Sequence, residues 1–172
     1  QTTMALGIAA TQASGLKSMF GTMCKPLHAG RAAMNGLLAA RWAARGFTSN
    51  HRALECSQGF AATQSTSLNV VPLRAEPDQA FAVESNLFKY HAACYFTHAS
   101  IDAMNDLRDN FGFAPDDVLK VHAHVPRQHF DVCDIRHPRT GLEMKFSIRQ
   151  VIAMALAGLD TGDTELYNPQ TA

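Results

Sequence analysis

The chain has 172 residues, with 15 basic and 15 acidic side chains, so its formal net charge at pH 7 is zero. This balance does not indicate a nucleic-acid or anionic-membrane partner, and no apolar run approaches the ~20 residues of a membrane-spanning helix. The first residues lack the basic start of a signal peptide. The four cysteines are widely spaced without a Cys-x-x-Cys pair, which favours free thiols and a cytoplasmic location.

The first part of the sequence, residues 1–64, predicts helices. It is rich in Ala, Gly, Leu and Met, and the small residues among these let helices approach closely. Pro26 suits the first turn of a long helix, and Gly46 is a typical residue just beyond a helix end. Shorter helices are expected over 4–11 and within 55–66. We interpret 1–64 as the end of a helical domain.

The remainder, residues 65–172, begins with a linker and then predicts a small domain that contains both helices and strands. Apolar residues recur at helical spacing in two segments, and strand-like patterns occur in three. The expected helices are 97–110 and 144–159, and the expected strands are 69–73, 118–125 and 130–135. The predicted fold class is therefore α+β, with part of a helical domain followed by a small α/β domain whose short sheet packs against helices.

A lysine and a histidine stand at the start of the long helix expected near Pro26. Lys25 and His28 are three residues apart, so their side chains share a helix face at the end where the helix dipole attracts anions. A di- or tricarboxylate suits such a site, because carboxylates accept charge-assisted hydrogen bonds from lysine. The alternative is a solvated lysine beside a histidine that only packs. Arg31, one turn further, could bind a carboxylate or join two helices.

A second lysine and histidine bracket an aromatic segment just before the helix expected over 97–110. His98, at the helix start, could bind a substrate carboxylate or transfer a proton. Lys89 is a second cation for an anionic substrate, and His91 is a candidate substrate-binding residue. In the alternative interpretation, Thr97 and His98 cap the helix and Lys89 stays in solvent.

Other kinds of catalytic site have weaker support. His122 and His124 would share a strand face, which is an acceptable spacing for two metal ligands. Cys94 and His98, four residues apart, have an acceptable spacing too. Neither pattern resembles a zinc finger, and alternating histidines on an exposed strand are usually solvated, so no metal is expected. The sequence has no Gly-x-Ser-x-Gly motif, phosphate-binding loop or dinucleotide fingerprint, and no cofactor is expected.

Three motifs together resemble the MmgE/PrpD family, which includes 2-methylcitrate dehydratases, cis-aconitate decarboxylases and an iminodisuccinate epimerase. The first contains K-P-L-H-x-G-R-A-A and lies at 25–33. The second combines K-Y, C, T-H and I-D-A elements over 89–103. The third, R-x-P-x-T-G-x-E-x-K-F-S, lies at 136–147, where we expect Lys145 and Ser147 to be mainly structural.

The resemblance implies cofactor-free lyase or isomerase chemistry on a small di- or tricarboxylate. Dehydration, decarboxylation and epimerisation stay open, all beginning with removal of an α-proton or with an equivalent carbanion. The implied partner is a small polycarboxylate, with no nucleic acid and no membrane. The implied catalytic residues are Lys25, His28, Lys89 and His98, and the implied substrate-binding residues are Arg31 and His91.

Members of this family are longer than the present chain, so the sequence is expected to be a fragment or a shortened relative with an incomplete active site. The alternative function is a catalytically inactive fragment that binds carboxylates or serves as an oligomeric interaction module. Apolar side chains on the long helix, which include Met34, Leu37 and Trp42, predict a homo-oligomer because large exposed apolar patches usually become covered.

Overall fold

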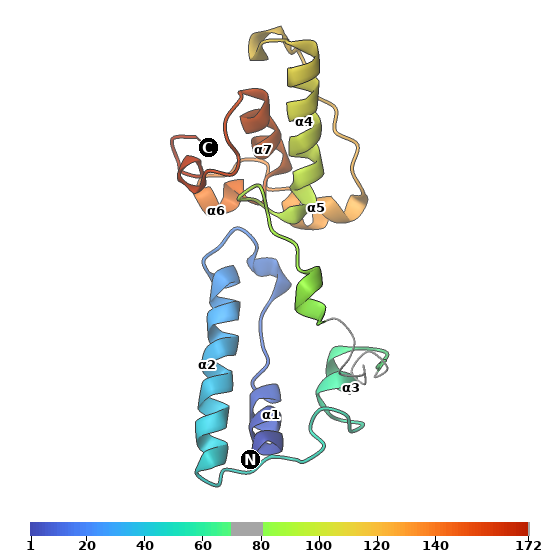
Figure 1. The fold of residues 1–172 in the computed structure, drawn as a ribbon, viewed down its shortest axis with the longest axis vertical. Coiled ribbons are helices and arrows are strands. Elements are labelled where there is room, and N and C mark those ends of the chain that lie inside the picture. Colours follow the sequence, from blue (N-terminus) through green and yellow to red (C-terminus); the bar gives the residue numbers. More distant parts are fainter. Residues whose placement is uncertain (70–80, 172) are drawn as a thin grey trace. The chain divides into compact units, whose positions relative to one another are not determined.

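The computed structural model describes residues 1–69 and 81–171, and the chain divides into two compact units. The first unit comprises Gln1–Leu16 and Pro26–Asn86, and the second comprises Lys17–Lys25 and Leu87–Ala172. Figure 1 shows their elements coloured along the sequence.

The first unit is built on two helices, α1 (Thr2–Ala10) and α2 (Cys24–Ala44), of which the first two residues of α2 belong to the second unit. A small apolar cluster joins Ile8 of α1 to Ala39 and Ala43 of α2. The alanines let the two helices approach closely. A short helix, α3 (Phe60–Gln64), lies further along the chain.

The expected helices of this unit are confirmed at 4–11 and from Pro26 onward, and α3 falls within 55–66. Gly46 follows the end of α2 with a φ of +90°, a backbone conformation that side chains with a Cβ rarely adopt. The glycine therefore allows the chain to turn away where the helix ends.

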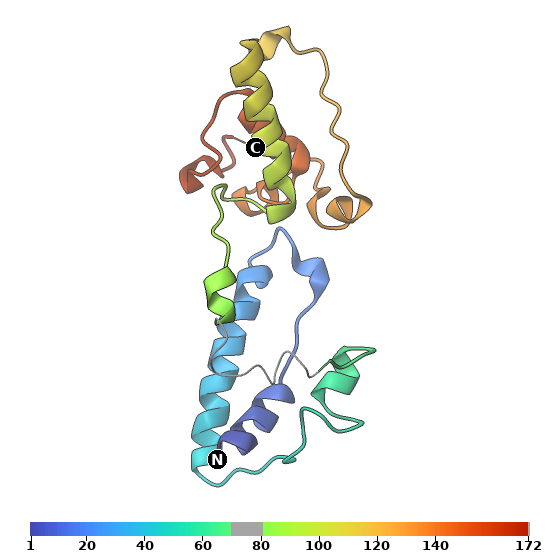
Figure 2. The same ribbon diagram turned by 45° about the vertical axis from the view of Figure 1, so that its right-hand side comes forward.

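The described residues of the second unit include the helices α4 (His98–Phe111), α5 (Arg127–Cys133), α6 (Gly141–Met144) and α7 (Ile148–Leu156). Helix α4 packs along α7, as Figures 1 and 2 show from two directions. The core between and around them consists of fully or nearly fully buried side chains, which include Ile101, Met104, Cys133, Met144, Ile148, Val151, Met154 and Tyr167. The helix predicted over 97–110 is confirmed as α4.

The third sequence motif forms the starts of α6 and α7. The Thr140 hydroxyl accepts a hydrogen bond from the Glu143 N–H, and the Ser147 hydroxyl accepts one from the Gln150 N–H, so each residue caps a helix. A Cβ on Gly141 would collide with the backbone carbonyl of Tyr167. These residues therefore position two helices of the core.

The predicted α+β class is wrong, because the described residues are mostly helical and form no sheet. Within 1–69 and 81–171, the β pairing is an isolated antiparallel bridge between Asp134 and Ser147. Segment 118–125 runs without regular secondary structure, and its Leu119 side chain is fully exposed. Its alternating pattern had suggested a strand, but a strand also needs a hydrogen-bonded neighbour.

Two further predictions of secondary structure need correction. Most of segment 130–135 lies in helix α5. The helix expected over 144–159 is shorter, because Ser147 caps the start of α7, which covers 148–156 of that range. The strand predicted at 69–73 lies mostly outside the described residues.

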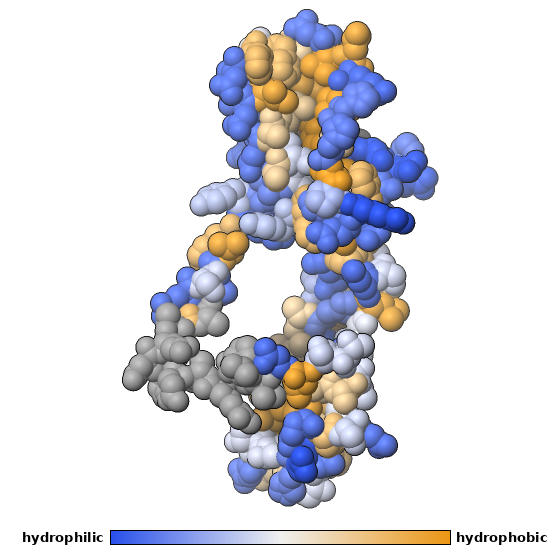
Figure 3. All heavy atoms as spheres, turned by 90° about the vertical axis from the view of Figure 1, so that its right-hand side faces the viewer, coloured by the Kyte–Doolittle hydropathy of each residue, from blue (hydrophilic) through white to orange (hydrophobic). Residues whose placement is uncertain are grey.

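Hydrophobic side chains also remain on the surface of both units (Figure 3). They include Met34 and Leu37 on α2 and Leu107 and Phe111 on α4. Over the two described ranges, no helix combines the length and the apolar character that crossing a membrane requires.

Candidate functional site

The segment that precedes α4 is held by backbone hydrogen bonds to two distant parts of the second unit. The Ala92 N–H donates to the Thr161 carbonyl at 2.9 Å, and the Cys94 N–H donates to the Lys145 carbonyl at 2.9 Å. The buried Thr97 hydroxyl donates to the Cys94 carbonyl at 2.7 Å. The part of the second sequence motif that precedes α4 is therefore a fixed loop that positions its side chains.

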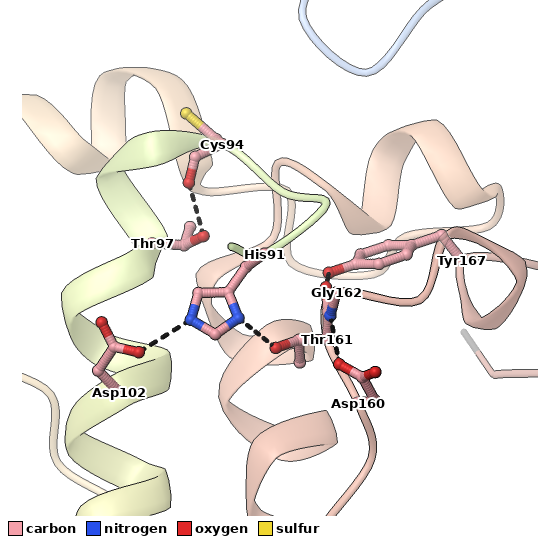
Figure 4. Close-up of polar contacts among 8 residues, drawn as sticks. All are labelled: His91, Cys94, Thr97, Asp102, Asp160, Thr161, Gly162 and Tyr167. Atoms are coloured by element: carbon pink, nitrogen blue, oxygen red, sulfur yellow. Dashed lines mark hydrogen bonds and ion pairs between the residues drawn. The ribbon is translucent and has the colours of Figure 1, made fainter. Parts of the chain in front are cut away.

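His91 is held at both ring nitrogens (Figure 4). Its Nδ1 lies 2.7 Å from the Thr161 hydroxyl, and its Nε2 lies 2.9 Å from a carboxylate oxygen of Asp102. The side chain of His91 is 12% exposed and that of Asp102 is 64% exposed, so this carboxylate reaches solvent. The buried Tyr167 hydroxyl donates to the Thr161 carbonyl at 2.9 Å, which fixes the loop that meets His91.

His98 is the first residue of α4 and is buried. Its ring lies edge-on to His91, with 4.9 Å between the ring centroids, and 5.1 Å from the ring of Tyr95. Burial lowers the pKa of His98 below 6.5, and its neighbours His91 and Lys89 lower it further, against opposing effects of the Ala93 backbone and Asp102. This shift favours the neutral form of His98 at pH 7.

One nitrogen of His98 is left without a partner. Its Nε2 is buried and makes no hydrogen bond among the described residues. Thr97 occupies the position before the helix, but its side chain does not cap α4 and bonds to Cys94 instead. Buried polar atoms are usually hydrogen-bonded, so an unpaired imidazole nitrogen beside a second histidine is unusual.

The two predicted lysines both belong to the second unit. The Lys89 ammonium donates to the Ala93 carbonyl at 3.0 Å. The Lys25 ammonium lies over the ring of Phe146, 5.5 Å from its centroid. Both positive charges act on the thiol of Cys94, so the two lysines are electrostatic neighbours of one group.

His28 and Arg31 lie in the first unit. They line a cavity of about 390 Å³ whose other walls are largely apolar and include Leu6 and Phe60. The half-buried His28 ring also packs against Gly15, where an added Cβ would lie 3.3 Å from the ring. The predicted residues are thus divided: His28 and Arg31 lie in one unit, and the lysines with His91 and His98 lie in the other.

Cys94 has a shifted thiol pKa that the sequence did not indicate. Its pKa is lowered from 9.0 to about 6, first by a hydrogen bond from the Cys133 thiol and then by the Phe96 backbone and the Lys89 and Lys25 charges, while partial burial opposes the shift. The same hydrogen bond, together with burial, raises the pKa of Cys133. The lowered pKa favours the ionised form of the Cys94 thiol near neutral pH. The sequence showed Cys94 between the two motif residues Lys89 and His98, but it had no signal for Cys133.

Across 1–69 and 81–171, no group of three or more His, Cys, Asp or Glu side chains is arranged to hold a metal ion. His122 and His124, which the sequence offered as a ligand pair, line a mainly apolar cavity together with Ile148 and Ile152.

The fold and the site define a chain of two units, the second of which holds the paired rings of His91 and His98 at the start of α4 and also contains Lys25, Lys89 and Cys94. Comparison with protein families matches residues 1–71 to the MmgE/PrpD N-terminal domain and residues 91–170 to the MmgE/PrpD C-terminal domain. The chain belongs to the MmgE/PrpD family. A search of curated proteins found no match.

Proposed function

We propose that this chain is a lyase or isomerase domain of the MmgE/PrpD type that removes a proton α to a carboxylate of a small di- or tricarboxylate. Buried His98, whose Nε2 has no hydrogen-bond partner and whose pKa is lowered by burial and by nearby charges that include Lys89, is the observation that carries the proposal. Family membership supports the same class of reaction.

His98 is the proposed base. A histidine with a lowered pKa is in its proton-accepting form at neutral pH, and an unpaired nitrogen needs no bond broken before it accepts a proton. His91 contacts His98 edge-on and is itself fixed by Asp102 and Thr161, so it keeps the His98 ring in one orientation.

Lys89 and Lys25 are the proposed substrate cations. Removal of an α-proton moves negative charge onto the carboxylate, and nearby ammonium groups stabilise that enediolate-like charge as it develops. The carbanion can then expel a β-hydroxyl, or regain the proton on its other face, while loss of carbon dioxide forms an equivalent carbanion. The same residues could therefore serve all three reactions, and the substrate that is bound would determine which of the three occurs. No cofactor is part of the proposal, and a cytoplasmic location stays a prediction.

Citrate, whose methylene protons are α to carboxylates, provides the first test. We expect citrate to raise the thermal stability of the chain, because a ligand at a hundredfold excess over its Kd stabilises the folded state by about 2.7 kcal/mol. Lys89→Ala and Lys25→Ala should lose this stabilisation, whereas the matched control Lys120→Ala, an exposed lysine elsewhere in the second unit, should keep it.

The proton-transfer step is tested separately by following deuterium incorporation into citrate in D₂O by NMR. We expect slow exchange with the unaltered chain and loss of exchange in His98→Gln, which should still bind citrate. Equal citrate stabilisation in Lys89→Ala and the unaltered chain would refute the substrate role of Lys89. Binding without any exchange would show a carboxylate-binding module in place of an enzyme.

A further inference from the structure

The second unit contains a cavity that lies outside the candidate site for polycarboxylates. Its volume is about 470 Å³, which is in the range of sites that bind small molecules. One wall is helix α7, and the other lining residues come from segment 121–124 and from Phe130 of α5. Figure 2 shows the stretch that includes 121–124 running from the far end of α4 back to α5. None of the residues proposed for substrate binding or proton transfer lines this cavity.

Most of the lining is apolar. On α7, Ile148, Ile152 and Leu156 follow one another at intervals of four residues, so they form one stripe along the helix. Ile148 and Ile152 are buried and Leu156 is half-buried, which places the stripe at the edge of the core. Such a wall favours the apolar body of a ligand, because burying apolar surface away from water is favourable.

The same cavity also has a positive charge on its wall. Arg149 lines it, and the Arg149 side chain is 47% exposed. Its guanidinium is paired with the Asp134 carboxylate, which also pairs with Arg136 at 3.6 Å, so two arginines share one carboxylate. None of the described lining residues is acidic, and His122 and His124 add ring nitrogens that can donate hydrogen bonds. The polar part of the cavity therefore suits an anion.

We propose that this cavity binds a small amphiphilic monocarboxylate, of the chemical class of a free medium-chain fatty acid. The alkyl chain lies along the apolar stripe of α7, and the carboxylate pairs with Arg149, whose planar guanidinium matches carboxylate geometry. A ligand with a carboxylate at each end is excluded, because the second charge would lose water against an apolar wall without gaining a partner. This inference goes beyond the proposed reaction on polycarboxylates and does not rest on it.

The first experiment titrates the full chain with sodium octanoate, below the concentration at which it forms micelles, and follows methyl signals by NMR. We expect the methyl signals of Ile152 and Leu156 to shift with a saturable dependence on octanoate. Hexanoate and heptanoate should bind successively more weakly than octanoate, by about fourfold in Kd for each methylene removed. Unchanged Ile152 and Leu156 signals at saturating octanoate would overturn the proposal.

Two ligands matched in length to octanoate test the charge at its end. Suberate carries a carboxylate at both ends of an eight-carbon chain, and we expect it to bind at least roughly tenfold more weakly than octanoate. Octan-1-ol has no carboxylate and should also bind more weakly, because it lacks the charge-assisted bond to Arg149. Equal affinity for suberate and octanoate would contradict an apolar end of the cavity.

Variants locate the ligand on α7. Ala153 lines the cavity but is exposed, so Ala153→Phe should fill the cavity without entering the core and should abolish octanoate binding. Arg149→Gln should weaken octanoate by roughly tenfold and leave octan-1-ol unchanged. The matched control Arg127→Gln, at an exposed arginine of α5 that does not line the cavity, should keep both affinities.

The ligand series on the unaltered chain and Ala153→Phe decide the question even if Arg149→Gln fails to fold. Octanoate binding that is unchanged in Ala153→Phe would refute the location. Displacement of octanoate by excess citrate would show one shared anion site and would also refute it. A chain that binds octanoate but not citrate would contradict the proposed function and leave this inference standing.

Discussion

At the scale of single residues, the second unit places ionisable groups close enough together for one group to shift the pKa of another. Lys89 lowers the pKa of both His98 and Cys94, because its positive charge opposes protonation of the first and favours ionisation of the second. The same charge therefore favours the neutral form of His98 and the ionised form of Cys94. The neutral form of His98 suits the proton abstraction proposed above.

The lowered pKa of His98 predicts a pH dependence of stability. As the pH falls below about 6.5, the unfolded chain binds a proton at this histidine before the folded chain does. We therefore expect the free energy of unfolding to decrease from pH 6.5 downward, until the pH passes the folded-state pKa. Denaturant titrations between pH 4 and 8 should show that His98→Gln flattens this decrease. The control His124→Gln, at an exposed position, should keep the original profile, and equal profiles for both variants would contradict the assignment.

At the scale of elements, the helices of the second unit depend on close contacts at their ends. Glycine at position 141 lets the start of α6 lie against the Tyr167 carbonyl, and Thr140 caps the same turn. The Asp134 carboxylate pairs with Arg149 and Arg136, which lowers its pKa and joins the end of α5 to the start of α7. The third sequence motif thus stabilises the second unit through its helix ends.

Two glycine substitutions test this role with opposite expected signs. Gly141→Ala should destabilise the chain by about 1–3 kcal/mol, because its Cβ would overlap the Tyr167 carbonyl and force a backbone shift. Gly30→Ala lies inside α2 with open space around the added Cβ, so it should stabilise by roughly 0.5–1 kcal/mol. Chemical denaturation measures both changes. A neutral Gly141→Ala would show that α6 does not need this close approach.

At the scale of the whole molecule, the exposed apolar surface of α2 is the feature that still needs an explanation. Leu27, Met34 and Leu37 are each more than half exposed on this helix. Met34 and Leu37 are three residues apart and so share a face. We propose that two or more copies of the chain associate through this helix, as expected from the sequence.

Sedimentation at tens of micromolar tests this association. We expect a species larger than a monomer, and we expect Leu37→Glu to shift the population toward monomer, because a charge in an apolar contact must be desolvated. Leu107→Glu makes the same change at an exposed leucine of α4 and should leave the association unchanged. A monomer at these concentrations for the unaltered chain would refute the proposal.

The sequence by itself determined the long helices and the family of the chain. Pro26 and Gly46 act on the backbone at their own positions, so the limits of α2 could be predicted to within a few residues. The motif residues Lys89, His91 and His98 lie within ten residues of one another, so the sequence alone could assign them to the segment that leads into one helix.

Only the tertiary structure decided which distant groups meet. An alternating pattern at 118–125 describes a chain that could pair with another strand, but it contains no information about whether such a strand is present. The partners of the His91 ring and of the Cys94 backbone, which are Thr161 and Lys145, come from other parts of the chain. A hydrogen bond forms between atoms that folding brings together, whereas periodicity and capping act over a few neighbouring residues. The backbone preferences were therefore predictable, and the chemistry of the site depended on the packing of the second unit.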